Sequence, residues 1–215
     1  RPALDAPDMP APKLVDVGEA VTAMVTVPSA SGDLVAAAEG NTVHLLDASG
    51  MEVRRLQCDG PVRVLSWWPE HRLLLAGCAD EQLLAFGEDG QRRWVFTSVM
   101  DPAVYAAAKT YWFKTAPGHE GVRGLFTGAF LDGKEQAFVG GACTLEIVDE
   151  NGQLVRRTPF FWGPGTLFQL VPQTDGSTNL LIAREPGDGF YCWVYNNQTG
   201  AKTQGFHLAP SGHSY

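Results

Sequence analysis

Apolar and polar residues alternate along this chain in a pattern that recurs four times. Each time, a mainly apolar segment runs into a polar turn that is closed by a glycine, at Gly50, Gly90, Gly152 and Gly200. A tight hairpin needs a residue with positive φ, which glycine supplies, and Asp or Asn tolerates the positions beside it. The pattern therefore predicts four equivalent β-hairpins.

Two further apolar segments precede each hairpin, and one polar segment follows its glycine. The segments directly upstream are apolar without alternation, as expected for strands covered on both faces; they span residues 34–38, 73–77, 137–141 and 180–183. The first segments of each unit span residues 22–27, 62–68, 124–130 and 167–171. The segment after each glycine is polar, which is typical of a half-exposed outer strand. Each unit is thus predicted to hold four strands.

The interval between closing glycines predicts how the units are arranged. It is 40, 62 and 48 residues, and removing an insertion at residues 98–121 brings the long interval close to 40. Blades of about 40–45 residues with four strands each are typical of a β-propeller. We therefore predict an all-β propeller with about four blades, at residues 17–59, 60–97, 122–160 and 161–208, with one short helix in the insertion. Residues 1–16, rich in Pro and Ala, are predicted to form a linker or arm. The alternative is a sandwich of irregular meanders.

The hairpin from Leu83 to Trp94 carries a resemblance to a known family. Its strand ends in Gly87-Glu88-Asp89-Gly90 and a Trp follows four residues later, which resembles the repeats of quinoprotein-like and WD-repeat-like propellers. The resemblance implies a ring of seven or eight blades, so the chain would be a fragment, half of a ring completed by a second chain, or a small four-bladed ring. No residues match those that hold pyrroloquinoline quinone or its calcium ion in that family, so no cofactor is expected.

Composition limits the partners. Asp and Glu number 24 against 16 Lys and Arg, for a net charge of −8, and a surface of that sign disfavours nucleic acid. No apolar run approaches the roughly 20 residues that span a bilayer. The chain begins at Arg1, so we expect either a removed leader or a segment of something larger, and we predict a secreted or periplasmic location.

The four cysteines are Cys58, Cys78, Cys143 and Cys192. They form no C-x-x-C pair, so no metal site is expected. Their disulfide status stays open.

Two connections between blades carry the candidate chemistry, because in a propeller such loops share one face of a rigid scaffold. In the insertion, Asp101 is a good N-cap for a helix at residues 103–113, which holds Tyr111 and Trp112. The insertion ends in a Gly/Pro turn that presents an imidazole beside a carboxylate, at His119 and Glu120. The second connection, residues 160–165, is an aromatic loop that contains Trp162.

Aromatic side chains beside His, Glu and Arg are typical of sugar recognition, since a pyranose stacks on Trp or Tyr while polar groups bind its hydroxyls. We therefore predict a non-catalytic module that binds a glycan or a protein through the loops around blade three. The predicted ligand-binding residues are Trp112, His119, Glu120, Trp162 and Arg184.

Two alternatives remain. In a propeller-type polysaccharide lyase, or another carbohydrate-active enzyme, His119 would be the base, Tyr111 the acid and Arg123 the group that neutralises a uronate. In a structural or assembly propeller, the aromatic residues would only fill gaps between blades. His44, which alternates with leucines on a strand, is predicted to be structural.

Overall fold

The computed structural model describes residues 15–18, 20–103, 106, 119–141, 143–159, 164–184 and 191–207. These residues form four antiparallel sheets of four strands each, and in every sheet the strands are adjacent in chain order. The first sheet holds β1 (Val21–Val27), β2 (Leu34–Glu39), β3 (Thr42–Leu46) and β4 (Glu52–Gln57). The second holds β5 (Val62–Trp68), β6 (Leu73–Cys78), β7 (Gln82–Gly87) and β8 (Arg92–Thr97).

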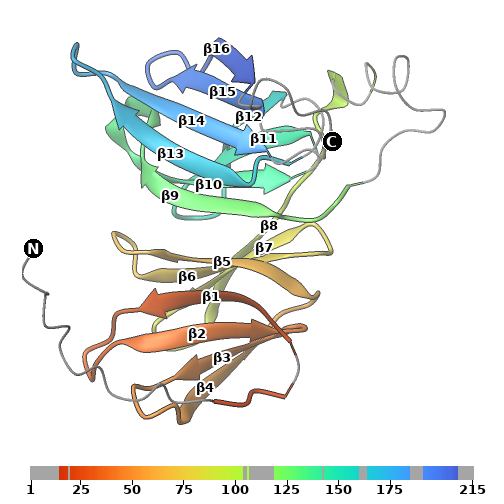
Figure 1. Cartoon of the computed structure of the whole chain (residues 1–215), viewed down its shortest axis with the longest axis vertical. Coiled ribbons are helices and arrows are strands. Elements are labelled where there is room, and N and C mark those ends of the chain that lie inside the picture. Colours follow the sequence, from red (N-terminus) through yellow and green to blue (C-terminus); the bar gives the residue numbers. More distant parts are fainter. Residues whose placement is uncertain are drawn as a thin grey trace, which may run out of the picture.

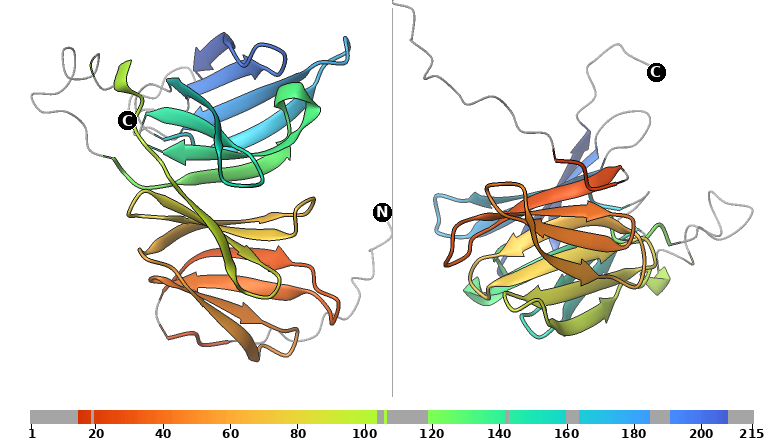
Figure 2. Two further views of the ribbon diagram at one scale, coloured as in Figure 1. Left: turned by 180° about the vertical axis from the view of Figure 1, so that it is seen from behind. Right: turned by 90° about the horizontal axis from the view of Figure 1, so that it is seen from below.

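The other half of the chain repeats this arrangement. The third sheet holds β9 (Gly124–Ala129), β10 (Glu135–Gly141), β11 (Thr144–Val148) and β12 (Leu154–Pro159). The fourth holds β13 (Leu167–Pro172), β14 (Thr178–Arg184), β15 (Tyr191–Asn196) and β16 (Lys202–His207). The first strand of each sheet contacts the first strand of the next, so the sheets fan out from β1, β5, β9 and β13, as Figures 1 and 2 show. The predicted all-β class and the count of four four-stranded units are confirmed.

Helical structure is sparse in the described residues. The predicted N-cap is present, because the Asp101 carboxylate accepts the backbone N–H of Ala103 at 2.8 Å. Pro102, Ala103 and Ala106 are helical, and the rest of the predicted helix lies outside the described residues. A three-residue 3₁₀ turn, η1 (Leu131–Gly133), joins β9 to β10, where the sequence predicted only a turn.

The hydrophobic core consists of three clusters, one between each pair of neighbouring sheets. The cluster between sheets one and two includes Val43 and Leu84, and the next includes Trp68 and Val139, all of them fully buried. The cluster between sheets three and four is aromatic, with the ring of Phe138 5.7 Å from that of Phe130. Burial on both faces explains why the second strands read as unbroken apolar runs.

The closing glycines have a second role besides their positive φ of 61° to 79°. A Cβ atom on Gly152 would lie 2.7 Å from the indole of Trp94 in the preceding sheet. The same indole donates a hydrogen bond of 2.8 Å to the backbone carbonyl of Glu150 in that turn. Only a glycine lets a neighbouring side chain pack so close to the turn.

The same contact occurs at the other two interfaces. Arg54 of the first sheet packs on Gly90 and donates to the carbonyl of Glu88, and Arg156 of the third packs on Gly200. Arg156 donates to the carbonyl of Thr199 at 2.6 Å. In each case the donor stands four residues after its own closing glycine, so one repeated position fastens each sheet to the next. We call this contact the inter-sheet latch.

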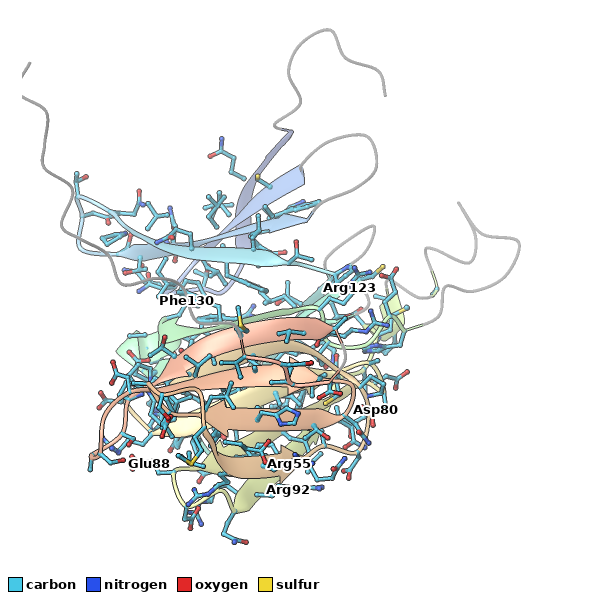
Figure 3. The ribbon with its side chains drawn as sticks, turned by 60° about the horizontal axis from the view of Figure 1, so that its bottom comes forward. Arg55, Asp80, Glu88, Arg92, Arg123 and Phe130 are labelled. Carbon is cyan, nitrogen blue, oxygen red and sulfur yellow. The ribbon has the colours of Figure 1, made fainter. Side chains whose placement is uncertain are left out.

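The strands define two ends of the molecule. Figure 3 places the labelled side chains of Asp80 and Arg123 toward one end of the sheets and those of Glu88 and Phe130 toward the other. The insertion at residues 98–121 leaves and rejoins the sheets at the first end, which we call the insertion end. The closing glycines lie in the turns at the opposite end, the glycine end.

Candidate functional site

The insertion begins at a segment that sheet three holds in place. The Ser98 backbone N–H donates to the Glu81 carbonyl at 2.8 Å, which continues the ladder of sheet two for one residue. The next backbone N–H, of Val99, donates to a carboxylate oxygen of Glu146 at 3.1 Å. The Asp101 N–H donates to the Thr144 hydroxyl at 2.7 Å. Two side chains of β11 thus fix the start of the insertion.

The insertion ends beside its own beginning. Nε2 of His119 lies 3.0 Å from Oγ of Ser98, across the base of the insertion. The Val122 N–H then donates to the Cys78 carbonyl, and the Arg123 N–H donates to the Gly140 carbonyl, both at 2.9 Å. These bonds close the insertion into a loop with a joined base, which we call the stem.

The imidazole of His119 is fully engaged within the stem. The backbone N–H of Gly121 donates to its Nδ1 at 2.9 Å, so Nδ1 carries no proton. In the neutral ring Nε2 then carries the hydrogen and donates it to the Ser98 hydroxyl. Burial lowers the pKa of His119 below its ordinary value, against the raising effect of nearby carboxylates, so the neutral form is favoured. Both ring nitrogens therefore serve the structure of the stem.

Glu146 is the buried centre of this region. It is fully buried, and one of its oxygens, Oε1, accepts the Val99 N–H and, at 2.9 Å, the Nε–H of Arg157. The same oxygen forms an ion pair with Nη2 of Arg157, also at 2.9 Å. The other oxygen, Oε2, is buried without a hydrogen-bond partner. A buried carboxylate is tolerated only when it is paired, and here the pairing ties β11, β12 and the insertion together.

A similar arrangement occurs at the corresponding position of sheet one. His44 stands six residues before its closing glycine, as Glu146 does. In the strand register His44 lies opposite Arg55 of β4, just as Glu146 lies opposite Arg157 of β12. His44 is buried between the carboxylates of Glu39 and Glu52, as expected for a structural histidine. The segment before β1 passes over Glu39, because a Cβ on Gly18 would lie 3.1 Å from that carboxylate.

Sequence reasoning missed Glu146, although one signal was present. A charged residue stands in the middle of Leu145-Glu146-Ile147-Val148, a run that is otherwise apolar and is fully buried in the structure. A carboxylate at such a position needs a cationic partner, and the register pairs it with Arg157. The other partner of Glu146, the Val99 amide, could not be predicted in this way, because its position depends on the path of the insertion.

The structure separates the predicted site residues into two groups. His119 turns inward to Ser98, whereas Glu120 and Arg123 form an ion pair at 3.2 Å with both side chains about half exposed. The imidazole and the carboxylate that the sequence placed side by side therefore point to different surroundings. Tyr111, Trp112 and Trp162 lie outside the described residues. Arg184 ends β14, and its side chain lies outside them too.

The second predicted connection packs against sheet three at its last residues. Pro164 and Gly165 are buried. The Gly165 carbonyl approaches paired glycines of β9 and β10 so closely that a Cβ on Gly124 or Gly140 would lie within 2 Å of its oxygen. Both connections named by the sequence therefore meet sheet three at the insertion end.

A cleft at the glycine end was not predicted. It has a volume of about 650 Å³ and lies among the turns of sheet one and the Glu88 turn of sheet two. Its rim is polar, with Ser31, Asp33 and Ser49, and Leu34 and Leu45 line it as well. A second, much smaller pocket of about 30 Å³ shares Leu34 and Leu45 with the cleft and is also lined by Trp67. The serines and aspartates of these turns were its only signal in the sequence.

In the described part of the chain, no three His, Cys, Asp or Glu side chains are placed to hold one metal ion. No helix among the described residues has the length and apolar character to cross a membrane. All four cysteines are buried, and none of them forms a disulfide.

No protein-family model and no curated protein sequence matches this chain. Solved structures do match. Hydrazine synthase of Kuenenia stuttgartiensis superposes with a TM-score of 0.64 at 11% identity, over 93% of this chain and 52% of that one. The structure of U3-55K superposes with a TM-score of 0.60 at 13% identity, over 86% of this chain and 51% of that one.

The chain has a β-propeller fold. Its four sheets are therefore blades one to four, and the chain spans about half the length of each of these two structures. Identities this low extend to the fold alone. A propeller scaffold is compatible with a binding or structural module in general, and function has to be argued from the site.

Proposed function

We propose that this chain is a non-catalytic recognition module that binds a glycan through the insertion end of blade three. The observation that carries the proposal is the stem. Hydrogen bonds at Ser98, Val99 and Asp101 fix the start of the insertion, and His119 fixes its end against Ser98. A loop with a fixed base on a rigid scaffold is a common way to present binding residues.

Glycan is the ligand class that the residues of this region favour. The insertion contains Tyr105, Tyr111 and Trp112, and the neighbouring connection contains Trp162. Aromatic rings provide flat apolar faces for sugar CH groups. The Glu120–Arg123 pair, about half exposed at the base of the insertion, supplies both a carboxylate and a guanidinium for hydroxyl or carboxylate groups of a sugar.

The state of His119 favours binding over lyase chemistry. A general base needs a free ring nitrogen within hydrogen-bond reach of the substrate proton. Nδ1 of His119 accepts the Gly121 N–H and Nε2 faces Ser98, so neither nitrogen is turned toward a ligand.

Binding to immobilised neutral and acidic polysaccharides, followed by calorimetric titration of the positives, tests the proposal. In one variant, a short Gly/Ser linker replaces residues 102–118 and the stem remains. In the control variant, Arg54→Ala changes the glycine end of blade one. We expect the wild type and the control to bind at least one glycan with micromolar to millimolar affinity and the linker variant to lose this binding.

Two results would contradict the proposal. Equal binding by the linker variant would place the site elsewhere, and no binding to any glycan by the wild type would exclude this ligand class. An ultraviolet-absorbing unsaturated product from a uronate polymer, lost in His119→Ala, would favour the lyase instead.

A further inference from the structure

Two of the four thiols meet at the interface between blades one and two. The thiols of Cys58 and Cys78 are neighbours, since each affects the pKa of the other, and the Cys78 thiol also donates to the Ala76 carbonyl at 3.8 Å. Cys58 directly follows the outer strand β4 of blade one, and Cys78 ends β6, the second strand of blade two. Their exposed fractions are 2% and 0%, and both belong to the same hydrophobic cluster.

The backbone holds the two residues in place from both sides. The Cys58 N–H donates to the Asn41 carbonyl at 2.8 Å, which fixes Cys58 to blade one. Cys78 pairs with Val62 across the sheet of blade two, and the N–H of the next residue, Ala79, donates to the Pro61 carbonyl at 2.8 Å. The short segment between Cys58 and Val62 is thus bonded at one end to blade one and at the other to blade two.

The electrostatic environment distinguishes the two thiols. The neighbouring Cys78 thiol has the largest effect on Cys58 and lowers its pKa, and the positive charge of Arg92 also lowers it, against the raising effect of burial. Arg92 is itself held nearby by Asp59 at 2.8 Å. The neighbouring Cys58 thiol, together with burial, raises the pKa of Cys78. Cys58 is therefore the sulfur that ionises first, and the thiolate is the reactive form.

We infer that Cys58 and Cys78 are a redox-active pair that forms a disulfide between blade one and blade two when a peroxide is present. Hydrogen peroxide is the oxidant for this disulfide. Both sulfurs are buried, so only a small molecule can reach them when the structure around them opens locally. Cys78 contributes only its backbone carbonyl to the stem, and neither sulfur belongs to the stem or to the glycan surface of blade three, so the disulfide and the proposed function are tested separately.

The reaction balances in two steps. The Cys58 thiolate attacks one peroxide oxygen, the O–O bond breaks, and the departing hydroxide leaves as water with the former thiol proton, giving a sulfenic acid. The Cys78 sulfur then attacks the Cys58 sulfur, the S–O bond breaks, and the hydroxyl group leaves as water with the Cys78 proton. Two thiols and one peroxide thus yield one disulfide and two waters.

The disulfide would close a loop of about 20 residues and add a covalent link between two blades that packing, the latch and hydrogen bonds such as that from Thr22 to the Val62 carbonyl hold together. Closing a loop of this length restricts the unfolded chain and stabilises the folded one. We expect the oxidised protein to melt roughly 5–10 °C above the reduced protein. Reduction with dithiothreitol is expected to reverse the difference.

Thiol counting and peptide mapping test the inference on the whole chain. Reduced protein is exposed to hydrogen peroxide, denatured, alkylated with N-ethylmaleimide and weighed by mass spectrometry. Wild type is expected to lose two of its four alkylation sites and to yield a cross-linked peptide that joins Cys58 to Cys78. Cys78→Ser is expected to form no disulfide and to give a dimedone adduct at Cys58, and the control Cys192→Ser is expected to behave as wild type.

Several results would overturn the inference. One is retention of all four alkylation sites in the wild type at peroxide concentrations that already oxidise its methionines. Another is a cross-link that involves Cys143 or Cys192, or one that joins two chains. A Cys58–Cys78 disulfide that leaves the melting temperature unchanged would refute its role in joining the blades. The wild-type peptide map decides the pairing even if a serine variant folds poorly.

Discussion

Truncation of Glu146 tests whether the stem is held as the structure indicates. Glu146→Ala removes the carboxylate oxygen that accepts the Val99 N–H and the Arg157 Nε–H and that forms the ion pair with the Arg157 guanidinium. Removing one partner of a buried ion pair costs about 3–5 kcal/mol. The Arg157 side chain is 26% exposed, so water partly compensates it, and we expect a loss of about 3 kcal/mol.

Two companion variants separate charge from packing. Glu146→Gln keeps an acceptor oxygen of the same shape but removes the charge, and a loss of about 1 kcal/mol is expected because neutral hydrogen bonds are weaker. Glu120→Ala removes the same charge from a half-exposed pair in the same region. Surface pairs contribute about 0–1 kcal/mol, so this control is expected to stay within that range.

Urea-induced unfolding, followed by tryptophan fluorescence, measures these free energies, and hydrogen exchange of the Val99 amide reports on the stem directly. We expect the loss of stability to be largest for Glu146→Ala, smaller for Glu146→Gln and smallest for Glu120→Ala. The Val99 amide is expected to exchange faster in Glu146→Ala than in the wild type. If Glu146→Ala costs no more than Glu120→Ala, the buried pair does not hold the insertion, and the reasoning fails.

Three further predictions concern packing and pH. Trp94→Ala removes one latch and is expected to cost about 2 kcal/mol in urea unfolding, whereas its exposed neighbour Val95→Ala should cost less than about 0.5 kcal/mol. Gly140→Ala places a Cβ against a backbone carbonyl and is expected to cost about 3 kcal/mol or more; Gly205→Ala, whose Cβ would have ordinary contacts, is the control, and equal melting temperatures would contradict the close approach. Burial lowers the pKa of His119, so below about pH 6.5 the unfolded chain binds a proton that the native chain does not. Stability should therefore fall as the pH drops from about 7.5 through about 6.5 toward the lowered native pKa, and thermal melts of His119→Asn should show a smaller pH dependence.

The repeat could be predicted from local chemistry alone. Each closing glycine marks a backbone conformation that other residues avoid, and the aspartates beside it accept backbone N–H groups of their own turn, as Asp149 does from Asn151 and Gln153. Because turns and alternation are local, the strand boundaries differed from those predicted by only one or two residues. The number of sheets and their internal order followed from the same signals.

The site was harder to predict because its contacts join distant parts of the chain. Glu146 meets the Val99 amide 47 residues away, and Trp94 meets the Glu150 carbonyl 56 residues away. The sequence indicated that His119 would face a ligand, yet the Gly121 amide and Ser98 occupy its two nitrogens. A turn rich in Gly and Pro can direct a side chain inward as readily as outward, and only the packing decides.

The glycine end offers the main competing location for a ligand. Its cleft has a polar rim, and a small pocket that shares lining residues with the cleft is lined by Trp67. The insertion end has the stem, and the sequences of the two connections that meet sheet three there contain Trp112 and Trp162. Because Trp67 lines the pocket beside the cleft, one spectrum can distinguish the two locations.

Fluorine NMR of protein labelled with fluorotryptophan, titrated with a glycan that binds, is therefore the most direct test of the recognition surface. The account predicts that the resonances of Trp112 or Trp162, assigned by single substitutions to phenylalanine, shift with increasing glycan, while those of Trp67 and Trp94 stay in place. Shifts confined to Trp67 would assign the ligand to the cleft between blades one and two and would contradict recognition at blade three.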